Sequence, residues 1–366
     1  MNVPLFTLNR QHEKLMDELM KATETVIKSG KFILGPWVTE FEEKVAEYLG
    51  VKYAIGVGNG TDAISIALSA IGVKPGDEVI TTPFTFIATA ETIAMLGAKP
   101  VFVDIDPDTF NINPELIEEK ITDKTRAIIP VHLYGQAADM DRIMQIANNY
   151  GLYVIEDTAQ GIGALYKGKK LGTIGHAGTF SFFPTKNLGA LGDAGLVVTN
   201  NEEIYKKAKS LRVHGSPRKY YHEYLGYNSR LDSLQAAYLL VKLPHTDKWN
   251  EMRRKNAEFY NDNLKDVVKV PVEREGNYHI YHQYSLRTEK RDELRDYLIN
   301  NGIGVAIHYP IPLHLQPAFS YLGYKKGDFP EAEKAAKEVL SLPIFPELTD
   351  EEKDYVVKKI REFFGK

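Results

Sequence analysis

The sequence predicts an α/β fold with a large, mixed, mostly parallel sheet that is covered by helices. Between residues 50 and 200, short apolar runs alternate with segments whose apolar residues recur at helical spacing. Such alternation is typical of a parallel sheet with helices packed on its faces. The chain has 366 residues, of which 43% are hydrophobic, so it has the length and the apolar content for about two domains.

The strands and helices of this first part follow from the local patterns in order. Short β-rich apolar runs predict strands at residues 53–58, 77–82, 99–105, 125–132, 152–157, 178–183 and 195–200. Apolar residues at helical spacing predict helices between them at residues 61–72, 86–97, 114–121 and 139–151. Thr61 stands at the start of the first of these helices, where threonine is a common N-cap.

The pattern changes after residue 200. A predicted helix at 201–215 leads into a loop rich in tyrosine and basic residues, and the next helix, at 231–243, ends at Pro244. The remaining elements are a long polar-faced helix at 248–264, a strand at 280–287, a helix at 291–302 and a closing helix from about residue 349. We therefore predict a large domain at residues 1–245 and a smaller C-terminal α/β domain at residues 246–366.

Composition excludes several classes of protein. The net charge of −4, from 45 basic and 49 acidic side chains, argues against a nucleic-acid binder. The absence of cysteine excludes disulfides, thiolate nucleophiles and zinc–thiolate sites. The N-terminal residues contain no apolar signal-like run, and no apolar stretch is long enough to span a bilayer. We expect a cytoplasmic protein with no nucleic-acid or membrane partner.

The stretch SFFPTKNLGALGDAG, residues 181–195, places one lysine in an apolar setting. Lys186 follows Phe182, Phe183 and Pro184 and precedes a glycine-punctuated turn. One interpretation is a loop lysine whose stem lies on the surface while its ammonium reaches water. The other is a lysine carried inward, whose pKa falls on desolvation and which can then act as a nucleophile or form a Schiff base.

Two further motifs fall at predicted junctions between strands and helices. In GVGNGTDA, residues 56–63, glycines allow close approach of a ligand and the free N–H groups of a helix start favour an anion, although a tight βα turn has the same appearance. Asp157 ends an apolar strand, where open α/β sheets place their ligand crevice, and Gln160 follows it. Asp157 has the alternative role of capping the next helix.

Together, a phosphate-binding turn, a strand-end carboxylate and an apolar-flanked lysine match the requirements of pyridoxal phosphate. That cofactor needs a lysine for a Schiff base, an acid opposite its pyridinium nitrogen and an anion site for its phosphate. The combination is more specific than any of its parts. It predicts an enzyme that uses pyridoxal phosphate and no metal.

Longer segments resemble the signature motifs of the DegT/DnrJ/EryC1/StrS sugar aminotransferases. These segments are PVFVDIDPDTFNINP, PVHLYGQAADMD, VIEDTAQGIGA, FSFFPTKNLGALGDAG and GYNSRLDSLQAA. The likeness extends over nearly the whole chain, from GKFILGPWVTEFE to HYPIPLH. It implies the type I pyridoxal-phosphate fold of aspartate aminotransferase, a homodimer with shared active sites, and amino transfer from L-glutamate to a nucleotide-linked keto sugar.

The resemblance also implies roles for individual residues around the cofactor ring. Lys186 corresponds to the lysine that binds the cofactor covalently and, once displaced, moves the proton. Asp157 corresponds to the partner of the protonated pyridine nitrogen, and Gln160 to the residue that hydrogen-bonds the ring hydroxyl. Phe86 occupies the position of the aromatic side chain that stacks on the ring.

Further carried-over residues concern the cofactor phosphate and the substrate. Thr61, Asp62 and Ser181 correspond to groups that hold the phosphate, and Asn228 to an asparagine that reaches it from the neighbouring subunit. The tract HGSPRKYYHEYLGYNSR, residues 214–230, corresponds to a cross-subunit wall for the nucleotide sugar, although a tyrosine-rich dimer loop is a competing interpretation. The resemblance makes Arg230, His308 and Tyr309 candidate substrate contacts.

The resemblance leaves the reaction partly open. The tyrosine-rich loop favours members that act at C-3 of UDP- or dTDP-linked 3-keto sugars, and amination at C-4 is the alternative. A sugar dehydratase of the same fold would have histidine in place of Lys186. A regulatory or DNA-binding protein, or a binding module that has lost its chemistry, is the alternative from another class.

Overall fold

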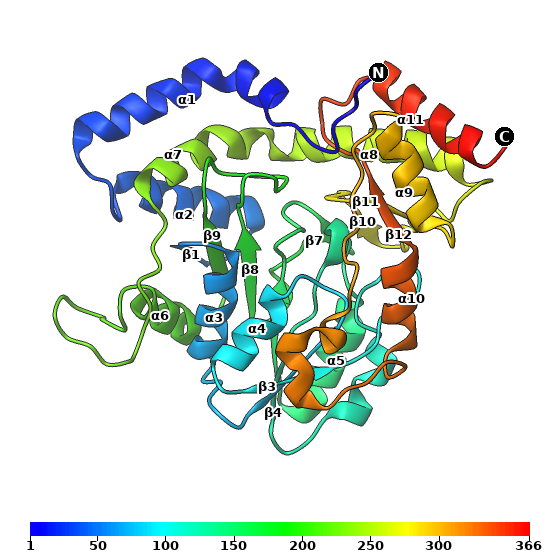
Figure 1. Cartoon of the computed structure of the whole chain (residues 1–366). Coiled ribbons are helices and arrows are strands. Elements are labelled where there is room, and N and C mark those ends of the chain that lie inside the picture. The colour runs from blue at the N-terminus through cyan, green and yellow to red at the C-terminus, as the bar shows by residue number, and fades with distance from the viewer.

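A seven-stranded sheet forms the centre of the computed structural model, which describes residues 1–366 (Figure 1). Its strands, in chain order, are β1 (Tyr53–Val57), β2 (Glu78–Thr81), β3 (Lys99–Phe102), β4 (Thr125–Ile128), β5 (Tyr153–Asp157), β8 (Ala177–Ser181) and β9 (Gly195–Thr199). Their spatial order is β1-β9-β8-β5-β4-β2-β3. Only β9 is antiparallel to its neighbours, β1 and β8. The predicted α/β class with a mixed, mostly parallel sheet is confirmed.

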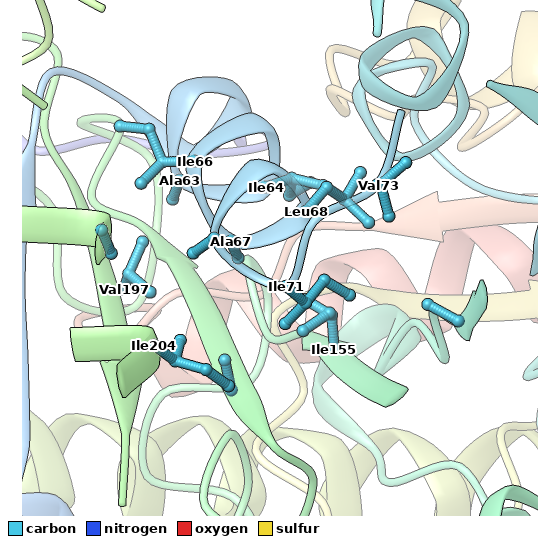
Figure 2. Packing of buried hydrophobic residues seen from close by; sticks show 14 of the residues in the cluster. Ala63, Ile64, Ile66, Ala67, Leu68, Ile71, Val73, Ile155, Val197 and Ile204 are labelled. Carbon is cyan, nitrogen blue, oxygen red and sulfur yellow. The ribbon is translucent and has the colours of Figure 1, made fainter. Parts of the chain in front are cut away.

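Helices cover both faces of the sheet because its strands bury side chains on both sides. On β5, Val154 packs into the cluster that contains α5, whereas its neighbour Ile155 packs into the cluster that contains α3. Figure 2 shows α3 directing Ala63 and Ala67 toward Val197 of β9. Continuous burial of successive strand residues is the pattern expected of parallel sheets. The helices of this part are α1 (Asn9–Ser29), α2 (Pro36–Leu49), α3 (Gly60–Ala70), α4 (Ala88–Met95), α5 (Met140–Tyr150), α6 (Glu202–Leu211) and α7 (Ser233–Lys242).

The C-terminal elements form a separate apolar cluster around a two-stranded antiparallel sheet of β11 (Tyr284–Arg287) and β12 (Val339–Leu342). Val3, from the N-terminus, also packs into this cluster. The remaining helices are α8 (Thr246–Leu264), α9 (Arg291–Asn300), α10 (Pro330–Glu338) and α11 (Asp350–Phe363), and a small sheet joins β6 (Leu165–Tyr166), β7 (Lys169–Lys170) and β10 (Asn277–Tyr278). The domain boundary at residue 245 stays a prediction. None of the helices has the length and apolar character needed to cross a bilayer.

Two expected helices differ from the structure. Residues 114–121 form two short 3₁₀ turns, Pro114–Leu116 and Glu118–Lys120, because only Ile117 is fully buried and so little apolar surface supports a regular helix. The helix expected at 201–215 ends at Leu211, since the Leu211 carbonyl accepts a hydrogen bond from the Tyr227 amide as the loop returns. Helices α1 and α2 precede the region in which we assigned elements.

Lys242 on α7 is fully buried and makes no ion pair with a carboxylate. Its Nζ donates to the Gly189 carbonyl at 2.9 Å and lies 3.0 Å from His12 Nε2. Burial lowers the pKa of Lys242 from 10.5 to about 8. Between these two values the unfolded chain binds more protons than the folded one, so Lys242 makes the free energy of unfolding rise with pH there. The lowered pKa corresponds to roughly 3 kcal/mol.

We therefore expect Lys242→Met to remove part of the rise in melting temperature that the wild-type protein shows between pH 8 and pH 10. The measurement is thermal unfolding followed by circular dichroism across this range. Lys248→Met, at an exposed position of α8, is the matched control and should leave the pH dependence unchanged. Equal pH dependence in Lys242→Met and the wild type would contradict this prediction.

Candidate active site

A cavity of about 450 Å³ lies at the carboxyl ends of β2, β4 and β5 and against the start of α3. This edge is where open α/β sheets bind ligands. The cavity brings together eight of the residues predicted from the sequence, namely Thr61, Phe86, Asp157, Gln160, Ser181, Lys186, His308 and Tyr309. Three others, Asp62, Asn228 and Arg230, do not line the cavity of this chain.

Lys186 lies on a tight turn that follows β8. Its amide donates to the Phe183 carbonyl at 2.8 Å, and the Ala190 amide closes the turn by donating to Phe182 at 2.8 Å. Desolvation lowers the pKa of Lys186 to about 8, although the nearby Asp157 carboxylate acts in the opposite direction. The Lys186 ammonium makes no hydrogen bond or ion pair within the chain, so it is free to react with a group in the cavity.

Asp157 ends β5 and is held in place by two hydrogen bonds. Its Oδ2 accepts from the Thr89 hydroxyl at 2.8 Å, and its Oδ1 accepts from the Ala159 amide at 3.1 Å. The side chain is buried, and only 5% of the residue is exposed. Sequence reasoning missed Thr89, whose only signal is a hydroxyl between two alanines in the first turn of α4. The carboxylate is thereby fixed where a cationic ring nitrogen can meet it.

The N-terminus of α3 lies beside Ser181 and presents backbone amides that could hold an anion. The cap of this helix is Asn59, whose side chain accepts from the Asp62 amide at 2.8 Å, so the expected cap at Thr61 was wrong. The amides of Gly60 and Thr61 in the first turn have no intrahelical acceptor. A Cβ at Gly60 would lie only 3.1 Å from Ser181 Oγ, so glycine is what allows the helix start to approach this hydroxyl.

Gln160, Tyr309 and Phe86 line another part of the cavity. Gln160 Oε1 accepts from the Tyr134 amide at 2.6 Å, which leaves its Nε2 to donate to the Tyr309 hydroxyl at 3.3 Å. Phe86 is 55% exposed, and its ring centroid lies 6.2 Å from that of Tyr309. An exposed phenylalanine in the wall of a cavity offers a ring face to a flat ligand.

Histidines also line the cavity. Burial and the Lys186 ammonium lower the pKa of His308 to about 4, so this imidazole is neutral at pH 7. Its Nδ1 lies 2.9 Å from Ser341 Oγ. His282, which sequence reasoning missed, lies in the segment that we had assigned only as a strand, and β11 in fact begins at Tyr284.

Asn228 and Arg230 belong to the loop that follows α6 and extends away from the body of the chain (Figure 1). Asn228 is exposed and pairs with Val213 in an isolated bridge, and Arg230 is half-buried. The tip of the loop exposes Tyr220 and Leu225, which are 85% and 100% exposed. In a single chain the loop therefore contributes nothing to the cavity, and the large side chains of Tyr220 and Leu225 are uncovered.

Comparisons with known proteins identify the family of this chain. A sequence profile of the DegT/DnrJ/EryC1/StrS aminotransferase family matches residues 13–361. A pleiotropic regulatory protein of Geobacillus stearothermophilus is 58% identical, over 100% of this chain and 99% of its own. The UDP-2-acetamido-2-deoxy-3-oxo-D-glucuronate aminotransferase of Pseudomonas aeruginosa is 46% identical, over 94% and 96% of the two chains.

A solved structure has almost the same backbone. DesV from S. venezuelae, in complex with a ketimine intermediate, superposes with a TM-score of 0.98 at 41% identity, over 100% of this chain and 99% of that one. Related solved aminotransferases are in forms with pyridoxamine or pyridoxal phosphate. The expected type I fold is therefore confirmed, and the chain belongs to the DegT/DnrJ/EryC1/StrS aminotransferase family.

Proposed function

We propose that this chain is a pyridoxal-phosphate-dependent aminotransferase that moves an amino group from L-glutamate to C-3 of a UDP- or dTDP-linked 3-keto sugar. The observation that carries the proposal is the pair formed by Lys186 and Asp157 in one cavity. A lysine with a lowered pKa and a buried carboxylate, placed beside an anion site, are the groups that this cofactor requires. The P. aeruginosa relative, an aminotransferase of a UDP-linked 3-oxo sugar, supports the substrate class.

The residues of the cavity fit the cofactor. The first-turn amides of α3, together with Thr61 and Ser181, suit its phosphate, because backbone N–H groups at a helix start favour anions. The exposed ring of Phe86 would cover one face of the pyridine ring. Asp157 would accept a hydrogen bond from the ring nitrogen, and Gln160 Nε2 would donate to the ring hydroxyl. Asp62 stays a weaker candidate because it does not line the cavity.

Bound in this place, pyridoxal phosphate would supply an electron sink for the carbon from which the proton is removed. Lys186 would take that proton and return it to a neighbouring carbon, because a pKa of about 8 leaves part of its amine neutral at pH 7. Asp157 would hold the positive charge of the ring. His308, which is neutral at this pH, and Tyr309 would contact the sugar.

The active site is completed in our proposal by a second copy of the chain. The loop at residues 214–230 extends outward and leaves Tyr220 and Leu225 uncovered, and Asn228 is exposed upon it. A partner subunit would receive this loop, so that Asn228 reaches the partner's cofactor phosphate. Arg230 would bind an anionic group of the nucleotide sugar, since its guanidinium suits bidentate contacts with phosphate or carboxylate.

A regulatory role is the alternative that one relative favours. The G. stearothermophilus protein is called a pleiotropic regulatory protein. Such a role does not by itself require a lysine of lowered pKa beside a fixed carboxylate, so the cavity favours catalysis. Amination at C-4 is the alternative within the family, because the same groups would serve it.

The test is an absorbance spectrum of the purified protein, followed by a panel of substrates. We expect a visible band from the lysine-bound cofactor that bleaches when L-glutamate is added. Keto-sugar nucleotides that carry the ketone at C-3 or at C-4, on UDP or dTDP, are then added. We expect only those with the ketone at C-3 to restore the band. Restoration by C-4 ketones alone would overturn the C-3 assignment. If no band appears after addition of pyridoxal phosphate, the proposal of an enzyme is overturned and the regulatory role is favoured.

A further inference from the structure

His282 lines the same cavity as Lys186 and has no role in the mechanism described above. It lies just before β11, and 6% of the residue is exposed. Its backbone amide donates to the Tyr134 carbonyl at 2.7 Å, which fixes its position beside the segment that holds Gln160. A buried imidazole with a fixed backbone can be oriented by its side-chain partners alone.

A chain of three side chains determines which nitrogen of His282 carries its proton. The Ile162 carbonyl can only accept, so Asn250 directs its Nδ2 to it, at 3.0 Å. The Asn250 Oδ1 must then accept from Asn187 Nδ2, at 2.7 Å. The side-chain oxygen of Asn187, Oδ1, then faces His282 and lies 3.0 Å from its Nδ1. His282 Nδ1 therefore carries the hydrogen, and Nε2 has a free lone pair.

The surroundings of His282 keep this tautomer neutral. Burial lowers its pKa well below the ordinary value of 6.5, and the charges of Lys186 and Arg253 act in the same direction. No group of the protein donates a hydrogen bond to Nε2. The side chain is thus a hydrogen-bond acceptor that stays unprotonated at neutral pH, in the cavity that also holds the unpartnered amine of Lys186.

We propose that His282 is a positioning residue of this site. In the structure its Nε2 and the Lys186 amine are both without a partner in one cavity, and in our proposal the Lys186 side chain turns so that its amine donates a hydrogen bond to the Nε2 of this tautomer-locked imidazole and is held in the cavity. This inference rests on the proposed function, in which Lys186 must be free of the cofactor while it moves a proton. With one of its N–H groups held by His282, the neutral amine directs its lone pair at a fixed angle. No proton is transferred to His282 in this role.

The first test needs neither cofactor nor substrate. In the full-length protein freed of cofactor, ¹⁵N NMR of labelled histidine should find one imidazole with a protonated Nδ1 and an unprotonated Nε2 that is lost in His282→Phe. Reductive ¹³C-methylation followed by NMR titration should show that the pKa of Lys186 falls by about one unit in His282→Phe, because a neutral acceptor stabilises the ammonium. An unchanged pKa of Lys186, or a protonated Nε2 in the wild type, would overturn the proposal.

The second test separates positioning from folding. In the holoenzyme, His282→Phe should lower kcat by about tenfold or more with little change in KM for L-glutamate, since the hydrogen bond is needed when the proton moves. His282→Gln should restore part of kcat, because its Oε1 can accept from Lys186 while its Nε2 donates to Asn187. A KM effect alone, or no recovery in the glutamine variant, would overturn the proposal. If neither the wild type nor the variants transfer an amino group, the proposed function fails, but the NMR result still shows whether His282 and Lys186 form the hydrogen bond.

Discussion

Replacing Lys186 with alanine should lower the rate of amino transfer from L-glutamate by at least about 10³-fold while leaving the fold intact, because it removes both the covalent anchor and the proton carrier. The substitution leaves no polar group without a partner, since the Lys186 ammonium has none within the chain. The backbone hydrogen bonds that close its turn do not depend on the side chain. The measurements are the rate of 2-oxoglutarate formation, the visible absorption band and the melting temperature.

Lys170→Ala is the matched control for this experiment. Burial also lowers the pKa of Lys170, but its Nζ lies over the ring of Tyr48, 3.2 Å from the centroid, and it does not line the cavity. This variant should keep its activity and its visible band. Added methylamine should restore part of the rate in Lys186→Ala and should leave the rate of the wild type unchanged. Full activity in Lys186→Ala without an added amine would refute the assignment.

The parts of the site that sequence reasoning found are those whose signals are local. Asp157 ends a strand that opens with the apolar residues Tyr153, Val154 and Ile155, and the end of such a strand marks the ligand edge of a parallel sheet. Lys186 follows a run of aromatic residues and precedes small residues, which marks a turn beside the core. Each of these features can be read from fewer than ten neighbouring positions, and the resemblance to a known family added the roles.

The parts that sequence reasoning missed depend on contacts between distant segments. The tautomer of His282 is set by Asn187 and Asn250, and ultimately by the carbonyl of Ile162, and these residues lie far apart in the chain. Similarly, Thr89 gains its importance only because α4 brings its hydroxyl to the Asp157 carboxylate, 68 residues away. Periodicity and local composition carry no information about such pairs.

The secondary structure predicted from the sequence is limited in the same way, by contacts between distant segments. Asn59 and Thr61 are both good N-caps, and the choice between them depends on where the helix begins once β1 is in place. It begins at Gly60, so Asn59 is the cap and accepts from the Asp62 amide. The helix expected at 114–121 is broken into single turns because tertiary packing covers too little of it. The roles of Asn228 and Arg230 stay predictions, since they require a second subunit.

Asp157→Asn should lower kcat by about 10²-fold or more although it makes the Lys186 amine easier to deprotonate. The Asp157 carboxylate raises the pKa of Lys186, so its loss should bring that pKa below about 8 in the cofactor-free protein. More neutral amine would then be present at pH 7. If the supply of neutral amine limited the reaction, the variant would be faster at this pH, whereas loss of the charge opposite the ring nitrogen makes it slower.

The comparison of Asp157→Asn with Thr89→Val separates the charge of this carboxylate from its position. Thr89→Val removes the 2.8 Å hydrogen bond to Oδ2 but keeps the anion, so its kcat should fall by only about tenfold, the effect of one hydrogen bond to a charged group. The measurements are kcat for the L-glutamate half-reaction across pH 6–9 and the NMR-determined pKa of Lys186. Equal losses in the two variants would mean that position matters more than charge. A rate at pH 7 above that of the wild type in Asp157→Asn would instead make the supply of neutral Lys186 the limiting factor and remove the ring-nitrogen role from Asp157.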